Sequence, residues 1–131
     1  LEQFGLIPAI DGMLSLYFEN SPIQVSFEHS GFDARIGTDV ELVLFRVLQE
    51  LVSNVIKHSG ANLLTVQIIR LNTHVMLNVS DNGIGFDVEN NQKSGIGLLN
   101  IASRIDAIKG ILRFESGAGN GTTVTIRAPI S

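Results

Sequence analysis

Two strand-like segments separated by only two residues constrain the fold of this chain more than any other feature of its sequence. Residues 63–71 and 74–80 each fit a strand, and Asn72-Thr73 between them leaves room only for a tight turn. Strands joined by a short turn pair antiparallel, because parallel neighbours need a long crossover connection. The pair therefore favours a two-layer α/β sandwich over a doubly wound parallel sheet.

The remaining segments fit the same architecture. Alternating polarity predicts further strands, and apolar residues at helical spacing predict helices. The predicted order is helix 8–19, strand 23–28, loop 29–37, helix 39–58, strands 63–71 and 74–80, helix 97–109, and strands 111–116 and 122–128. We expect a single domain over residues 1–131, of the α/β (α+β) class, with its helices on one face of the sheet.

The helix over residues 39–58 is expected to have defined ends. Thr38-Asp39-Val40-Glu41 matches a capping box, in which the Thr and Glu side chains bond free amides at the helix start. Gly60 suits the position just after the helix. Because apolar residues cover most of its circumference, we expect this helix to be buried nearly all round.

Composition excludes several classes of function. The 131 residues include no cysteine, which removes disulfide frameworks, thiolate zinc sites, iron–sulfur clusters and cysteine nucleophiles. The formal net charge of −4 makes a nucleic-acid backbone a poor partner. The longest apolar run, Leu42 to Phe45, is four residues, so we expect no membrane span and no direct membrane contact.

Polar residues nevertheless gather on one side of the helix over residues 39–58. At about 100° per residue, Arg46, Glu50, Asn54, Lys57 and His58 fall within one arc. One interpretation is the solvent-facing stripe of an amphipathic helix. The other is a site for a metal–phosphate complex, because Glu50 and Asn54 are i, i+4 neighbours that can direct two oxygen ligands at one hard cation.

Asp81 continues the inward phase of Val75, Leu77 and Val79, so its carboxylate is expected on the apolar side of the sheet. A buried carboxylate needs hydrogen-bond donors, either from nearby turn amides or from a ligand. Two glycines follow in Asp81-Asn82-Gly83-Ile84-Gly85-Phe86 and permit close approach to a flat ligand.

A second glycine pair, Gly95-Ile96-Gly97-Leu98, opens the helix over residues 97–109. Free amides at a helix start form an anion site, and the polar segment 87–94 between the two pairs fits a flap over a phosphate chain. This layout matches neither a strand–GxGxxG–helix unit nor a P-loop.

These motifs resemble the ATP-binding domain shared by sensor histidine kinases, gyrase-type topoisomerases, heat-shock chaperones and mismatch-repair ATPases, the GHKL superfamily with the Bergerat-type fold. The matching segments, in the family's order, are Glu50 to Ser59, Asp81 to Phe86, Gly95 to Leu98 and Gly119 to Thr122. Within the family, the chain is similar to one branch: the bacterial histidine kinases that pair with helix-turn-helix response regulators. The similarity lies in Asn54 to Ser59, in the short flap over residues 87–94 (the lid) and in Gly97 to Arg104. The resemblance implies a mixed, mostly antiparallel sheet.

The resemblance also implies roles for individual residues. Asp81 would accept a hydrogen bond from the adenine amino group, and Thr122 would support it through a water. Asn54 would hold Mg²⁺ against the triphosphate of ATP, with Glu50 behind it or acting as general base. The remaining implied nucleotide contacts are Lys57 and His58 at the phosphates, Gly83, Gly85, Gly95 and Gly97 in the lid, and the amides near Gly97 and Leu98 at phosphate oxygens.

As a histidine kinase domain, the chain would donate the γ-phosphate of ATP to a histidine elsewhere. The family's acceptor motif, a histidine closely followed by an acidic residue on a helix, is missing, and residue 1 is Leu. We therefore expect an excised part of a longer protein, with residues 1–9 as the remnant of a linker from upstream dimerisation helices. The implied partners are those helices and a response regulator receiver domain, in the cytoplasm or on the cytoplasmic side of a membrane-anchored sensor. The alternatives are a stand-alone ATPase or anti-sigma-factor serine kinase, and a non-catalytic module.

Overall fold

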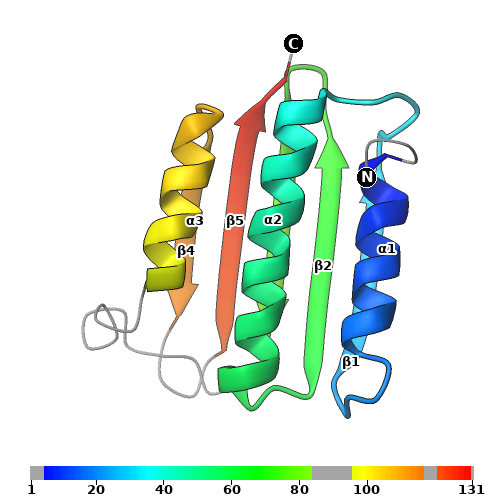
Figure 1. Cartoon of the computed structure of the whole chain (residues 1–131), viewed down its shortest axis with the longest axis vertical. Coiled ribbons are helices and arrows are strands. Elements are labelled where there is room, and N and C mark those ends of the chain that lie inside the picture. The colour runs from blue at the N-terminus through cyan, green and yellow to red at the C-terminus, as the bar shows by residue number, and fades with distance from the viewer. Residues whose placement is uncertain (1–4, 84–95, 117–120, 131) are drawn as a thin grey trace.

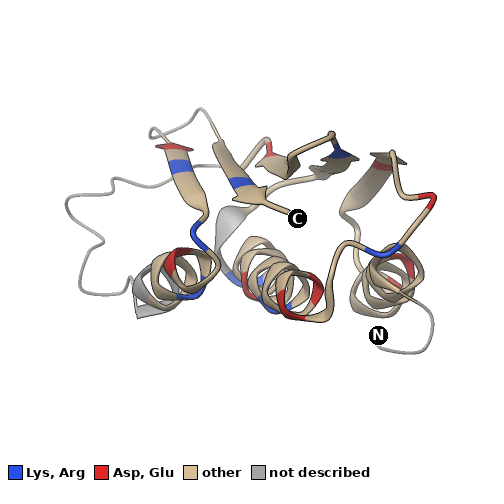
Figure 2. Ribbon diagram, turned by 90° about the horizontal axis from the view of Figure 1, so that it is seen from above, with Lys and Arg blue, Asp and Glu red and all other residues tan. Residues whose placement is uncertain are grey.

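A five-stranded sheet forms one layer of the structure, and helices on one of its faces form the other (Figures 1 and 2). The computed structural model describes residues 5–83, 96–116 and 121–130. Its elements are α1 Leu6–Tyr17, β1 Gln24–Ser30, α2 Thr38–Asn54, the π-helical turn η1 Val55–Ser59, β2 Leu63–Arg70, β3 His74–Asp81, α3 Ile96–Ala107, β4 Ile111–Ser116 and β5 Thr122–Pro129. The predicted element order and the two-layer fold class are confirmed.

The sheet has the strand order β1-β2-β3-β5-β4. Strand β1 is parallel to β2, and the other three pairings are antiparallel. The tight turn after β2 is closed by a 2.8 Å hydrogen bond from the Leu71 N–H to the His74 carbonyl, as the two-residue spacing requires. The mixed, mostly antiparallel sheet is therefore confirmed.

The core lies between the sheet and the helices, because every strand alternates in polarity. The fully buried side chains include Ile10, Leu44, Leu48, Ile101 and Ile105 from the helices and Leu64, Ile68, Leu77 and Ile126 from the strands. The opposite face carries polar cross-strand pairs, such as Asn78 with Thr125 and Ser80 with Thr123, whose side chains hydrogen-bond each other at 3.0 and 3.1 Å. This pattern explains why helices cover one face only.

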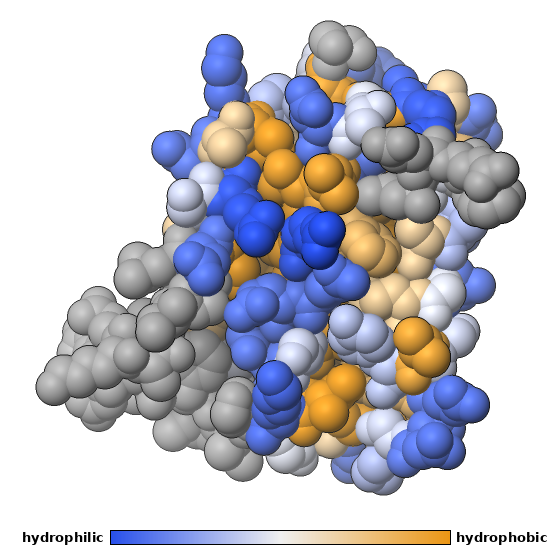
Figure 3. Space-filling view, in the orientation of Figure 1, coloured by the Kyte–Doolittle hydropathy of each residue, from blue (hydrophilic) through white to orange (hydrophobic). Residues whose placement is uncertain are grey.

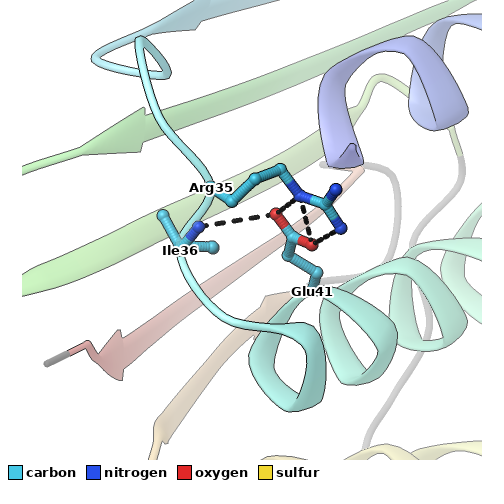
Figure 4. A network of polar contacts seen from close by, with 3 residues as sticks. All are labelled: Arg35, Ile36 and Glu41. Carbon is cyan, nitrogen blue, oxygen red and sulfur yellow. Dashed lines mark hydrogen bonds and ion pairs between the residues drawn. The ribbon is translucent and has the colours of Figure 1, made fainter. Parts of the chain in front are cut away.

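The predicted capping box at the start of α2 is wrong. No side-chain cap hydrogen bond is present, and Gly37, with a φ of 119°, occupies the N-cap position. The Glu41 side chain instead turns inward, where it is 2% exposed and forms an ion pair with Arg35 (Figure 4). Its carboxylate accepts hydrogen bonds of 2.9 Å from Arg35 Nε and of 3.5 Å from the Ile36 N–H. A guanidinium from the preceding loop has replaced the helix's own amides as partner.

The apolar composition of helix α2 suggested that the helix is buried nearly all round, and this prediction is wrong. Leu42 is 44% exposed, and Ile56 in the following turn is 40% exposed. The helix face of the molecule accordingly shows apolar patches among hydrophilic ones (Figure 3). A helix that packs on one side of a single sheet keeps its outer side in water, whatever residues stand there.

Candidate functional site

The described parts of the segments singled out in the sequence meet at one edge of the sandwich. Helix α2 and strands β3 and β4 end there, and β5 and α3 begin there, at the lower end of Figure 1. This follows from the topology, because β3 and β5 are antiparallel neighbours joined in register from Asp81↔Thr122 to His74↔Pro129. Candidate residues more than 60 positions apart in the sequence are thereby placed on one edge.

A polar row crosses three strands at this edge, on the face that the helices cover. Asp81 lies opposite Thr122, and Thr122 lies opposite Ser116. The next inward row is apolar and consists of Val66, Val79, Val124 and Phe114. The inward phase predicted for Asp81 is therefore confirmed, and its carboxylate borders the core rather than open solvent.

Asp81 is partly buried, and among the described residues its side chain accepts a hydrogen bond from one donor. Its Oδ1 accepts a 2.8 Å hydrogen bond from the Gly83 N–H, which is the turn-amide partner that the sequence left open. Burial raises the pKa of the Asp81 carboxyl, and the hydrogen bond from Gly83 acts in the opposite direction and lowers it. A carboxylate held at an apolar border in this way is a suitable acceptor for a ligand's N–H group.

The neighbouring Thr122 is fixed by contacts that the sequence did not reveal. Its hydroxyl lies 2.9 Å from that of Ser116, which also donates a 3.2 Å hydrogen bond to the Gly121 carbonyl. Gly121, with a φ of 75°, packs so closely on Asp81 that an added Cβ would lie 2.2 Å from the Asp81 carbonyl oxygen. Only a glycine fits this approach.

The end of α2 carries the second half of the candidate site. Glu50 is half-buried, Asn54 and Lys57 are exposed, and in the described part of the chain neither Glu50 nor Asn54 has a side-chain hydrogen-bond partner. The helix widens into η1 directly after Asn54, so the regular 100° spacing used to place Lys57 and His58 does not hold beyond that residue. Gly60, with a φ of 64°, ends the turn as predicted.

A magnesium ion fits the side chains at this end of α2. Glu50 and Asn54 stand one helical turn apart and offer carboxylate and amide oxygens, and Mg²⁺ in nucleotide sites takes one or two such ligands together with phosphate oxygens and water. Among the described residues, no cluster of three or more His, Cys, Asp or Glu could hold a metal.

Several predicted site residues cannot be placed. Gly85, Gly95 and the flap over residues 87–94 lie outside the described residues, as does the side chain of His58. The backbone of Gly97 and Leu98 lies in the first turn of α3, which confirms that a helix begins at this glycine pair.

The chain also matches a known protein family. Residues 39–131 match the family described as "Histidine kinase-, DNA gyrase B-, and HSP90-like ATPase". The chain belongs to this family. Since its members are ATPases, the nucleotide of this domain is ATP.

Relatives narrow the comparison to histidine kinases. The chain is 34% identical over its whole length to the signal transduction histidine-protein kinase/phosphatase DegS of Brevibacillus brevis, and it covers 34% of that protein. It is 32% identical over 92% of its length to the sensor histidine kinase ComP of Bacillus subtilis, of which it covers 16%. The chain thus spans about a third or less of each relative.

A solved structure shows the same fold. The blue-light activated histidine kinase EL346 of Erythrobacter litoralis matches with a TM-score of 0.83 at 16% identity, over 97% of this chain and 42% of that one. Among the described residues, no helix is long and apolar enough to cross a membrane.

Proposed function

We propose that this domain binds Mg-ATP and donates the γ-phosphate to a histidine on a separate dimerisation domain, as the catalytic part of a sensor histidine kinase. The observation that carries the proposal is the position of Asp81: a partly buried carboxylate at the edge where Asn54 and Glu50 also lie. This edge then offers a hydrogen-bond acceptor for the adenine base and oxygen ligands for a cation, and a nucleoside triphosphate site requires both.

The proposed phosphoryl transfer needs little covalent participation by the protein. Phosphoryl transfer depends on positioning and on neutralising charge, and Mg²⁺ supplies the neutralising charge when bound. In the proposal Asp81 accepts a hydrogen bond from the adenine amino group, with Thr122 beside it. Asn54 would hold the cation, with Glu50 behind it or acting as general base, and Lys57 and His58 would face the phosphates. Gly83, Gly85, Gly95 and Gly97 allow the lid to close, and the amides near Gly97 and Leu98 bind phosphate oxygens.

The partners follow from the proposed reaction. The acceptor histidine stands on dimerisation helices of the same parent protein, reached through residues 1–9, and the phosphoryl group passes on to a response regulator receiver domain. The reaction takes place in the cytoplasm, where ATP is available.

Calorimetric titration of the chain with ATP tests this proposal, with Mg²⁺ and again with a chelator. We expect saturable binding that weakens without Mg²⁺, and no phosphate release from the chain alone. When a purified dimerisation domain that carries an acceptor histidine is added with γ-labelled ATP, label should move to that domain. Absence of binding at millimolar ATP would contradict the proposal, and steady phosphate release by the chain alone would favour a stand-alone ATPase.

A further inference from the structure

Asn82, the residue after Asp81, makes a set of contacts that neither its position nor its exposure suggests. Its Oδ1 accepts hydrogen bonds from the N–H groups of Asn62 at 3.1 Å and Leu63 at 3.0 Å. Its Nδ2 donates a 2.6 Å hydrogen bond to Asn62 Oδ1, and its backbone N–H donates to the Leu63 carbonyl at 3.3 Å. One residue is thus tied to two others by four hydrogen bonds.

The far side of this contact is the segment that leaves the end of α2. Gly60 ends η1 in a left-handed conformation, and Asn62 follows two residues later. Asn62 is itself anchored, because its carbonyl accepts a 2.9 Å hydrogen bond from the Gln24 N–H at the start of β1. The segment from Gly60 to Asn62 therefore has little freedom once Asn82 holds it.

This bond set links the two halves of the candidate site. Asn54 and Lys57 lie just before Gly60, and Asp81 lies just before Asn82. Along the chain, the path from Asn54 to Asp81 runs through the whole β2–β3 hairpin. The hydrogen bonds between Asn82 and Asn62 give a second, shorter connection, which lies at the edge that carries the candidate site. Exposed hydrogen bonds of this kind contribute modestly to folding stability, but errors of about 1 Å in a site lower activity strongly.

We infer that Asn82 is a positioning residue that holds the base half of the nucleotide site, at Asp81, in register with the metal and phosphate half, at Asn54 and Lys57, by its bonds to Asn62. This inference rests on the proposed function. Neither the strand pairing of Asp81 with Thr122 nor the hydrogen bond that Asp81 accepts from the Gly83 N–H involves the Asn82 side chain. Loss of Asn82 should therefore affect ligands that span both halves and spare a ligand that touches only the base half.

Asn82→Ala tests this expectation by competition against a fluorescent ATP analogue, with Mg-ATP and with adenosine as competitors. We expect affinity for Mg-ATP to fall about tenfold, because two binding elements that are no longer held together lose their effective concentration for each other. Affinity for adenosine should stay within about twofold of wild type. Asn72→Ala, in the exposed turn at the other end of the same strands, is the matched control and should change neither value.

Asn62→Ala removes only the side-chain bond to Asn82 Nδ2 and serves as the milder variant. It should lower Mg-ATP affinity by about threefold, and the double variant should bind no worse than Asn82→Ala, since the shared bond is already lost. Wild-type affinity for Mg-ATP in Asn82→Ala, or an equal loss for adenosine and Mg-ATP, overturns the inference. If Asn82→Ala does not fold, unchanged affinity in Asn62→Ala overturns it. Failure of the wild-type chain to bind Mg-ATP would instead overturn the proposed function.

Discussion

Helix α2 carries one glutamate near each end, and the two have opposite environments. Glu41 is 2% exposed and is surrounded by donors from Arg35 and Ile36 (Figure 4). Glu50 is half-buried and, in the described part of the chain, has no side-chain partner. Both carboxylates stand on one helix, so residue type and helical position do not separate a structural acid from a candidate ligand-binding one. Their partners do.

This difference indicates that the two ends of α2 have different roles. At its start, polar groups are satisfied by each other, which stabilises the fold. At its end, the side chains of Glu50, Asn54 and Lys57 have no partner among the described residues, which suits a ligand that supplies partners. Backbone geometry at that end is still tightly fixed, by Gly121 against Asp81 among other contacts.

The largest expected effect is on stability, from Glu41→Ala. Breaking the ion pair should lower the free energy of unfolding by about 3 kcal/mol, the low end for buried pairs, because Arg35 is 44% exposed and regains water. Urea denaturation measures this, with exposed Glu19→Ala as control. Nucleotide affinity of the folded protein should stay within about twofold. A tenfold loss of affinity would show that the two ends of α2 are not independent.

Gly121→Ala should come next, because it disturbs the backbone at the nucleotide edge. An alanine there meets the Asp81 carbonyl and must adopt a positive φ, so the free energy of unfolding should fall by about 2 kcal/mol. Gly12→Ala is the matched control. It lies within α1 with nothing within 4 Å of the added Cβ, and it should stabilise the protein by about 0.5–1 kcal/mol. Equal effects of the two substitutions would argue against a tight edge.

Asn54→Ala should affect nucleotide affinity and not stability, whereas Glu41→Ala should affect stability and not affinity. We expect affinity for Mg-ATP to fall about tenfold, equivalent to about 1.4 kcal/mol, while the free energy of unfolding changes by less than about 0.5 kcal/mol. Titrations with and without a chelator separate the contribution of the cation, since the difference from wild type should vanish when Mg²⁺ is removed. Exposed Asn20→Ala is the control.

The smallest effect concerns pH. Because burial raises the pKa of Asp81, its neutral form is favoured in the folded state, and the associated stability is lost as pH rises through that raised pKa. At pH 7 the ionised carboxylate therefore opposes folding slightly. Asp81→Asn should be as stable as wild type or more so at pH 7, with a gap that closes as the pH falls toward about 4. Lower stability of the variant at pH 7 would contradict this sign.

Much of the fold and part of the candidate site could be predicted from local sequence patterns. Turn length and alternating polarity predicted the paired strands, and the inward phase of Asp81 followed from Val75, Leu77 and Val79. The placement of Glu50 and Asn54 on one side of a helix followed from their spacing. These features depend on residues close in the sequence, whose relative positions are fixed by helix and strand geometry.

Other features depended on partners that no local pattern specifies. Glu41 matched a capping box, but Arg35 from the preceding loop offered a charged partner that outcompetes backbone amides. The contacts between Asn62 and Asn82 and between Ser116 and Thr122 arise only when strands pair. The π-helical turn after Asn54 replaces a regular helix that apolar periodicity alone would continue to His58. Each needed the folded chain to become visible.

The central claim, that Asp81 selects an adenine nucleotide, is tested most directly by comparing ATP with GTP in wild type and in Asp81→Asn. Adenine presents an amino donor where guanine presents a carbonyl acceptor, so a carboxylate accepts from the first and repels the second. We expect wild type to prefer Mg-ATP over Mg-GTP by about 10- to 100-fold. Asp81→Asn should bind Mg-ATP more weakly and lose most of that preference. Equal affinity of wild type for the two nucleotides, or an unchanged preference in Asp81→Asn, would contradict the account.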